Sequence, residues 1–273
     1  MKKENLSTKE TITWCPGCPN HMILESVKQA IANSGIKQEM FAMTTDIGCN
    51  AKIYDYLNIS GIYGLHGRAL VTGEGIKLGN PNLKVLSFIG DGGNYNEGIS
   101  HFIHAGKHNA DMVLIVHDNQ SFSLTTGQPT ATSQTGYKSK ASPLGVFDSP
   151  LNPIKLALAS GMGFIARCNA RDIKHTAEVL TKAIKYKGFA YVEIIQDCLI
   201  FNFDMNDKDK LMYKIKDNKD LKIANKLAEE WDYNSKKGKI PIGVLYFKEK
   251  PCLSDKWLQL AKLKKNGVGW KDK

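Results

Sequence analysis

The run Met-Val-Leu-Ile-Val-His at residues 112–117 is almost continuously apolar and constrains the fold most. Such a run is typical of a strand buried on both faces, as parallel strands are. Two further strands are predicted before it, at 40–45 and 84–90, and two after it, near 163–167 and at 189–195. Segments with helical patterning separate these strands. The alternation predicts an α/β domain with a mainly parallel sheet and flanking helices.

The expected helices cover residues 20–34, 67–79, 97–108, a segment after Pro153, and 171–186. We expect Asn20 to cap the first helix and Gly35 to end it. The segment 118–150, rich in Thr, Ser, Gly and Pro, is predicted to be a long loop. A loop of that length in a compact domain is usually functional.

The character of the sequence changes near residue 200, where lysine and aspartate become frequent. We predict one domain at residues 1–200 that carries the chemistry, and a C-terminal extension with helical patches at 201–273. The extension is expected to pack on the domain or on a partner.

The formal net charge of +10 comes almost entirely from lysine, since Arg68, Arg167 and Arg171 are the only arginines. This balance argues against sequence-specific nucleic-acid binding, which often uses arginine. The lysines form either an ordinary solvated surface or a docking face for an acidic protein. The polar start shows no apolar signal-peptide core, and no apolar run approaches the roughly 18 residues of a membrane span. A reducing cytoplasm is the expected compartment.

Cysteine spacing raises several possibilities. Cys15 and Cys18 form a CxxC pair, and Cys49 and Cys198 follow predicted strands. A CxxC pair can be a redox dithiol, part of a zinc site, part of an iron–sulfur site, or two unrelated thiols. In a reducing compartment, cysteines serve metals or catalysis more often than disulfides.

Polar residues collect where the predicted strands end: Asp46 and Cys49, then Gly90, Asp91 and Gly92, then Asp118 and Asn119, and finally Cys198. Ligands of open α/β sheets bind at this edge, so the sequence predicts a single site there. A carboxylate and an amide oxygen on adjacent strand ends suit Mg²⁺. The glycines allow close approach of a diphosphate.

The Gly-Asp-Gly motif followed 28 residues later by Asn119 resembles the diphosphate-binding motif of thiamine diphosphate enzymes. The segments WCPGC, IGC, LHGRAL, TGEGIKLGNPNLKV, GDGG, HFIHAGKHN, DNQSFSLTTGQPT and DCLIFN extend the resemblance to residues 13–203. In this order they are similar to the β subunit of 2-oxoacid:ferredoxin oxidoreductases. The resemblance implies a thiamine diphosphate-binding fold.

It also implies a [4Fe-4S] cluster held by Cys15, Cys18, Cys49 and Cys198. Cysteine ligation of this kind suits a cubane cluster. Cys168 and Cys252 match no ligand of the family and are expected to be ordinary thiols.

For the cofactor, the resemblance implies that Mg²⁺ is held by the side chains of Asp91 and Asn119 and by the backbone carbonyl of Ser121. Gly90, Gly92 and Gly93 would lie near the diphosphate, and His66 and Thr125 near the reacting groups. The remaining expected cofactor-site residues are Asp46, Ile47, Gly48, Gly67, Arg68 and Leu124, with Gln128 on the same loop as Thr125.

Several positions depart from the family pattern. Pro19 stands where the family has glycine, and Gly93 stands where an acidic residue is common. Phe122, Ser123 and Thr126 alter the loop over the cofactor. No departure removes a predicted ligand, and those in the loop bear on substrate preference.

The implied reaction is coenzyme A-dependent oxidative decarboxylation of a 2-oxoacid, 2-oxoglutarate or pyruvate, with electrons passing to ferredoxin. The family places the glutamate that contacts the aminopyrimidine ring on an α subunit, so an αβ heterodimer or a dimer of such units is expected. Two alternatives stay open. A non-redox thiamine enzyme related to acetolactate synthase would use the GDG motif, and a zinc-held interaction module would use the cysteines.

His101, His104 and His108 share one face of a predicted helix. Histidines at this spacing could hold a metal. The family carries the first two without a metal, so we expect packed histidines or histidines that support the site from behind.

Overall fold

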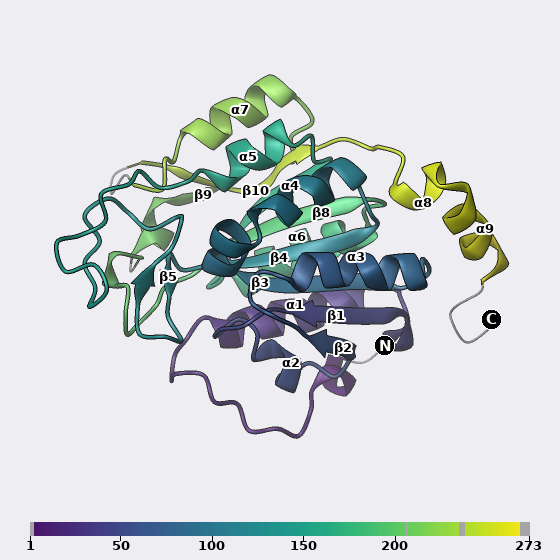
Figure 1. The fold of residues 1–273 in the computed structure, drawn as a ribbon, viewed down its shortest axis with the longest axis horizontal. Helices are drawn as coiled ribbons and strands as arrows, with labels where there is room; N and C mark the ends of the chain where they lie inside the picture. Colours follow the sequence, from purple (N-terminus) through teal and green to yellow (C-terminus); the bar gives the residue numbers. More distant parts are fainter. Residues whose placement is uncertain (1–2, 206, 235–237, 268–273) are drawn as a thin grey trace.

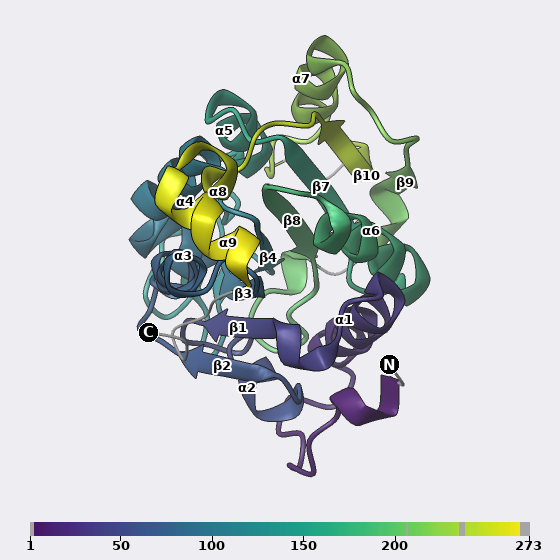
Figure 2. The same ribbon diagram turned by 90° about the vertical axis from the view of Figure 1, so that its right-hand side faces the viewer.

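The computed structural model describes residues 3–205, 207–234 and 238–267. Its centre is an eight-stranded sheet in the order β2-β1-β3-β4-β8-β7-β10-β9, with helices on both faces (Figures 1 and 2). The strands are β1 Phe41–Thr45, β2 Ser60–Tyr63, β3 Lys84–Gly90, β4 Met112–Asp118, β7 Phe164–Asn169, β8 Phe189–Ile195, β9 Met212–Lys214 and β10 Ile240–Phe247. All neighbouring strands of this sheet pair in parallel except β10 and β7. The predicted mainly parallel α/β fold is confirmed.

Strand β4 lies inside the sheet, and every one of its residues is buried. Its register places Val113 beside Leu86 of β3 on one side and beside Ala190 of β8 on the other. Apolar side chains can therefore point to both faces and pack under helices, which is why the strand shows no polar alternation.

The helices form two layers. They are α1 Asn20–Ser34, α2 Ile53–Tyr56, α3 Ala69–Gly79, α4 Ile99–His108, α5 Pro153–Ala159, α6 Ile173–Lys185, α7 Leu221–Glu229, α8 Leu253–Lys256 and α9 Leu258–Asn266. One core cluster joins α1 and α6 to the sheet, and a second joins α3, α4, α5 and α7 to the opposite face (Figure 2). Of the helices in the described part of the chain, none is long and apolar enough to cross a membrane.

The predicted helices are confirmed, with small shifts at their ends. Gly35 ends α1 with a φ of 79°, the left-handed conformation that glycine adopts without a Cβ penalty. The predicted cap at Asn20 is wrong. Pro19 stands at the capping position, and the Asn20 side chain makes no capping hydrogen bond. Its carbonyl oxygen instead lies 2.9 Å from Nδ1 of His117.

The predicted long loop at 118–150 contains a small hairpin, formed by β5 Ser121–Phe122 and β6 Gln128–Pro129. The loop continues directly from the carboxyl end of β4. It lies at the left of Figure 1, whereas α8 and α9 lie at the right-hand end of the molecule. The hairpin therefore stands over the edge of the sheet where the polar residues collect.

The chain after residue 200 adds two strands that the sequence did not predict. Strand β10 pairs antiparallel with β7, and β9 pairs parallel with β10. A third apolar cluster under this part contains Trp231 and Tyr233. The C-terminal extension thus continues the central sheet.

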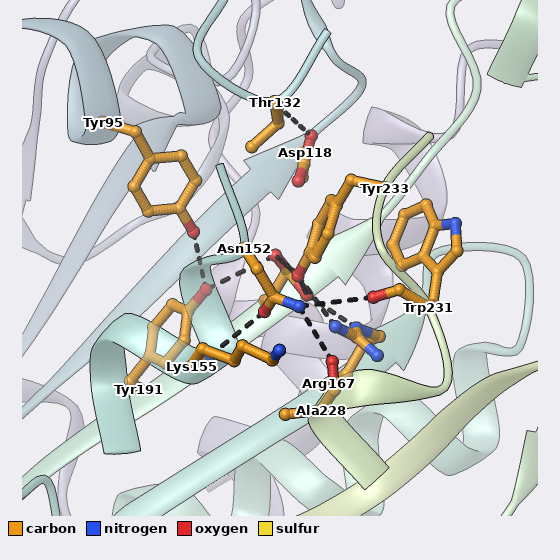
Figure 3. A network of polar contacts seen from close by, with 11 residues as sticks. Tyr95, Asp118, Thr132, Asn152, Lys155, Arg167, Tyr191, Ala228, Trp231 and Tyr233 are labelled. Carbon is orange, nitrogen blue, oxygen red and sulfur yellow. Dashed lines mark hydrogen bonds and ion pairs between the residues drawn. The ribbon is translucent and has the colours of Figure 1, made fainter. Parts of the chain in front are cut away.

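A buried ion pair ties this extension to the sheet (Figure 3). Nε of Arg167 on β7 donates to Glu193 on β8 over 2.7 Å, and both side chains are fully buried. The hydroxyl of Tyr233 lies 2.7 Å from both Glu193 carboxylate oxygens, and the Arg167 guanidinium stacks over the Trp231 ring. Burial would lower the pKa of Arg167, but its contacts with Tyr233 and Glu193 raise it. The guanidinium therefore stays charged.

Candidate functional site

Two adjoining cavities lie at the carboxyl edge of the sheet. The first, of about 70 Å³, is named here the glycine cavity because Gly90, Gly92 and Gly93 line it. The second, of about 220 Å³, is named the cysteine cavity because Cys15, Cys18, Cys49 and Cys198 line it. The residues that line both cavities are Cys49, Asn119, Ser123, Leu124 and Gln196. The two cavities therefore share a wall.

Most of the predicted site residues come together here. Those that line the glycine cavity are Ile47, Gly48, Cys49, His66, Gly90, Asp91, Gly92, Gly93, Asn119, Ser121, Leu124 and Thr125. The structure thus brings residues from separate strand ends together at this edge of the sheet. Asp46, Gly67, Arg68 and Gln128 do not line either cavity.

The glycine turn is packed so closely against its neighbours that side chains would not fit at Gly92 and Gly93. A Cβ atom at Gly92 would lie 2.3 Å from the Phe122 ring, and one at Gly93 would lie 1.9 Å from Oδ2 of Asp46. Helical backbone begins at Asp91, directly after β3, and the first N–H groups of such a turn have no partner within the helix. Those of Asp91 and Gly92 donate to the Asp91 carboxyl. Such a turn fits a diphosphate, because its backbone can approach closely and its N–H groups attract anions.

Asp91 offers an oxygen ligand in a buried setting. Burial raises the pKa of Asp91 to about 6, although hydrogen bonds from Thr130 and Thr132 lower it. The Thr132 hydroxyl lies 3.0 Å from Oδ2 of Asp91 and 3.1 Å from Oδ1 of Asp118 (Figure 3 draws the second contact). Burial and the nearby Asp91 and Glu193 carboxyls raise the pKa of Asp118 well above its usual range. A divalent cation would favour the ionised form of Asp91, so the donor set fits Mg²⁺.

Asn119 is held by the loop that follows it. Its Oδ1 accepts from the backbone N–H of Ser121 over 3.1 Å, and its Nδ2 donates to the Ser123 hydroxyl over 3.0 Å. The second lone pair of Oδ1 stays available for a cation. Asn119 and Ser121 line the same cavity as Asp91, which is the grouping the sequence predicts.

The four cysteines of the cysteine cavity come from three separate segments of the chain. Burial and the neighbouring thiols of Cys18, Cys198 and Cys15 raise the pKa of Cys49 to about 11. The backbone N–H of Phe201 donates to the Cys198 sulfur over 3.3 Å. A bound cation would share the charge of a Cys49 thiolate and favour its ionised form, so the four sulfurs fit as thiolate ligands of a metal centre.

The spacing of the cysteines bears on which centre they could hold. Among the described residues, no group of three or more His, Cys, Asp or Glu side chains is arranged to hold a metal ion. A closed zinc site would need four ligands around one atom. In the structure the four cysteines line a cavity of about 220 Å³ together with other residues.

His66 lies at the rim of the glycine cavity, between two carboxylates. Its Nδ1 is 3.4 Å from Oδ2 of Asp46 and 3.4 Å from Oε2 of Glu97. Asp46 is fully buried behind His66, and burial raises its pKa to about 7. Arg68 donates to the backbone oxygen of Glu97 over 2.7 Å, so it holds the His66 loop against the following helical turn.

Thr125 lies on the hairpin loop above the cavity. Its hydroxyl donates to Oε1 of Gln128 over 2.5 Å, and Nε2 of Gln128 donates back to the Thr125 carbonyl over 2.7 Å. Gln128 thus fixes Thr125, which itself lines the cavity.

The sequence did not indicate several lining residues. Asn50 and His117 line the glycine cavity, Asn20 lines the cysteine cavity, and Gln196 lines both. Gln196 directly follows strand β8, so its position at a strand end could have indicated that it belongs to the site. His117 lies within an apolar strand, and nothing in the sequence indicated that it lines a cavity.

The three helix histidines form no metal site within the described residues. His104 and His108 are exposed, with ring centroids 5.8 Å apart, and His101 is half-buried. The expectation that all three are packed or support the site is wrong for His104 and His108. Cys168 and Cys252 are both buried and lie outside the two cavities, as ordinary thiols would.

The fold and the glycine cavity together define a thiamine diphosphate-binding domain. Residues 46–194 match the family model described as "Thiamine pyrophosphate enzyme, C-terminal TPP binding domain". The 2-oxoacid:ferredoxin oxidoreductase subunit beta of Saccharolobus solfataricus is 39% identical over 250 residues, which cover 86% of this chain and 82% of that protein. The 2-oxoglutarate synthase subunit KorB of Archaeoglobus fulgidus is 36% identical over 185 residues, covering 68% and 69%.

A solved structure agrees. The 2-oxoglutarate:ferredoxin oxidoreductase from Magnetococcus marinus, with 2-oxoglutarate, coenzyme A and succinyl-CoA bound, matches with a TM-score of 0.89. The identity is 32%, and the match covers 97% of this chain and 90% of that chain. The chain belongs to the family of 2-oxoacid:ferredoxin oxidoreductase β subunits. It is a subunit of an oxidoreductase, as its sequence predicts.

Proposed function

We propose that this chain, with an α subunit, carries out coenzyme A-dependent oxidative decarboxylation of a 2-oxoacid. The substrate is 2-oxoglutarate or pyruvate, and the electrons leave through a [4Fe-4S] cluster to ferredoxin. The observation that carries the proposal is the wall shared by the glycine and cysteine cavities. A decarboxylation site and an electron acceptor have to lie this close for electrons to pass from one to the other.

We assign thiamine diphosphate to the glycine cavity, with its diphosphate against Gly90, Gly92 and Gly93. When bound, this cofactor supplies the electron sink that lets a 2-oxoacid lose CO₂. Asp91 and Asn119 would hold Mg²⁺ through their side chains, and Ser121 through its backbone carbonyl. The buried Asp91 carboxyl and the free lone pair of Asn119 support this assignment.

We assign the cluster to Cys15, Cys18, Cys49 and Cys198. Their thiols line one cavity, and the Phe201 N–H already points at the Cys198 sulfur. His66 and Thr125 are the proposed catalytic residues. His66 lies at the cavity rim with its Nδ1 3.4 Å from both the Asp46 and the Glu97 carboxylates, and Thr125 is fixed by Gln128.

Partners follow from the same proposal. A β subunit needs its α subunit, and in the Magnetococcus marinus enzyme the bound molecules are 2-oxoglutarate, coenzyme A and succinyl-CoA. Lys52 lines the cysteine cavity and is the nearest candidate for docking an acidic ferredoxin. Lys52→Glu should slow reduction of ferredoxin, and Lys222→Glu on remote helix α7 should not. Equal rates of ferredoxin reduction in both variants would contradict docking of ferredoxin at Lys52.

We also propose the division into a cofactor-binding unit at residues 1–200 and a C-terminal extension at 201–273. The glycine cavity draws only on the first part, while Leu199, Ile200 and Phe201 of the cysteine cavity lie at the boundary. Because Tyr233 and Trp231 cover a buried ion pair, we expect removal of the extension to lower stability sharply.

The test of function is anaerobic. The αβ enzyme is mixed with coenzyme A and one 2-oxoacid at a time, and the broad visible band of the cluster is followed. Bleaching by 2-oxoglutarate or by pyruvate would support the proposal and name the substrate. A stable band with every 2-oxoacid, in a sample with full cluster content, would contradict it.

A further inference from the structure

The side-chain amide of Asn20 is buried, and only its oxygen has a hydrogen-bond partner. Asn20 is the first residue of α1, is fully buried and lines the cysteine cavity. Its Oδ1 lies 2.9 Å from Nδ1 of His117, but its Nδ2 has no hydrogen-bond partner of regular geometry. A buried polar group without a partner is costly, so a fully buried amide of this kind points to a missing acceptor.

His117 determines which way this amide faces. An amide oxygen only accepts, so Nδ1 of His117 must carry the hydrogen of that contact. Burial lowers the pKa of His117 to about 3, so the ring is neutral and its Nε2 is a bare acceptor at the glycine cavity. Nε2 has no partner either. One neutral ring in one tautomer therefore connects Asn20 to the other cavity.

Cys18 lies two residues before Asn20 and lines the same cavity. The Nδ2 end of the Asn20 amide, which no protein group satisfies, is therefore close to a sulfur that can accept. The opposite orientation of the amide would turn its oxygen toward that sulfur, with two acceptors facing each other. The contact with His117 and the proximity of Cys18 thus favour the same orientation.

We propose that Asn20 is a positioning residue of the metal centre: held by His117, it donates its side-chain N–H to the Cys18 sulfur and raises the reduction potential of the bound cluster. The inference rests on the proposed assignment of the cluster to the cysteine cavity. Reduction adds negative charge to the cluster and its sulfurs, so a donated N–H stabilises the reduced state more than the oxidised state.

The test is a redox titration of the αβ holoenzyme, read by visible absorbance and electron paramagnetic resonance. Asn20→Leu removes the donor and the acceptor together. Asn20→Asp keeps an oxygen for His117 but replaces the donor with a carboxylate, and acidic residues are favoured in a first helical turn. Both variants should shift the midpoint to a lower potential, and Asn20→Asp should shift it further. If the leucine variant does not assemble, the aspartate variant still provides the test.

Ser26→Ala is the matched control. Ser26 is fully buried on the same helix and donates only to the backbone oxygens of Met22 and Ile173. Its loss perturbs α1 without removing a group that faces either cavity, so the midpoint should not move. Midpoints of both Asn20 variants equal to that of Ser26→Ala would overturn the inference.

A second readout follows His117 directly. In protein labelled with ¹⁵N-histidine, Asn20→Asp should keep the Nδ1–H tautomer of His117, and Asn20→Leu should lose it. An unchanged tautomer in the leucine variant would contradict the role of this contact. Iron and sulfide are measured in every sample. Absence of iron and sulfide from the wild type would contradict the proposed function. Full iron and sulfide content with unchanged midpoint potentials in the Asn20 variants would contradict only the role of Asn20.

Discussion

A Cβ atom at Gly93 would lie 1.9 Å from Oδ2 of Asp46, so the two positions cannot both carry a side chain in this arrangement. From the resemblance of the sequence we expected an acidic residue at position 93, where this chain has glycine. In the structure, the carboxyl of Asp46 fills the space beside Gly93 and contacts His66 from behind. Asp46 therefore supplies a carboxyl group at this turn from a different strand.

Gly93→Ala tests this relationship. The new methyl group would displace Asp46 and crowd Nδ1 of His66, which lies 3.1 Å from the same position. We expect a loss of about 1–3 kcal/mol in stability, as for other overpacked sites, and at least about a tenfold loss in thiamine diphosphate affinity. Chemical denaturation and isothermal titration calorimetry measure the two effects.

Gly75→Ala is the control for that variant. Gly75 lies within α3, and a Cβ there would meet nothing within 4 Å. Alanine should stabilise this helix by about 0.5–1 kcal/mol and leave cofactor affinity unchanged. If Gly93→Ala behaved like Gly75→Ala, the close approach of Asp46 would have no consequence.

The pKa of about 6 at Asp91 predicts how cofactor binding depends on pH. Binding of Mg²⁺ and the diphosphate needs the carboxylate, and the free site holds a proton below this pKa. Affinity should be flat above about pH 6 and fall by about tenfold per pH unit below it. Asp91→Asn should bind weakly throughout and keep only the pH dependence of the diphosphate itself. The same slope in wild type and variant would exclude Asp91 as the titrating group.

Removing one partner of the buried ion pair between Arg167 and Glu193 should destabilise the protein strongly. Glu193→Gln leaves a buried guanidinium without its counter-charge and should cost about 3–5 kcal/mol of unfolding free energy. The exposed pair of Lys182 and Asp217, with side chains 49% and 47% accessible, is the comparison, and Asp217→Asn should cost less than about 1 kcal/mol. Equal costs in urea unfolding would contradict the importance of burial here.

Cysteine substitutions should separate into two classes. Cys49→Ser should lower the iron content of purified protein, because Cys49 stands in the wall shared by both cavities. Cys252→Ser should leave iron content unchanged, because Cys252 lies outside both cavities, where it caps helix α8 and contacts Ser254 and Asp255. Equal iron loss in both variants would point to general instability rather than lost ligation.

The sequence predicted the centre of the sheet better than its margins. Strands β3 and β4 are apolar on both faces and could be recognised by composition alone. Strand β2 was missed because it is a short, mostly exposed edge strand. Strand β10 was missed because Pro241 and Gly243 interrupt its apolar run within a lysine-rich region. Tertiary pairing overrides local propensity in both cases.

The site was predicted where motifs marked it and missed where only packing did. Asp91 and Asn119 were found because strand ends converge at one edge. Arg167 and Glu193 gave no local signal, since they are 26 residues apart and become neighbours only through the register of β7 and β8. Asn20 was expected to cap a helix, and only the fold brings His117 within reach of its side chain.

The central claim is that the cysteine cavity holds a [4Fe-4S] cluster beside the cofactor. The most direct measurement is iron, zinc and acid-labile sulfide in protein purified without oxygen together with its α subunit. The account predicts about four iron and four sulfide per β chain from a cluster of this type. Zinc without sulfide, or a chain with neither iron nor sulfide, would contradict it.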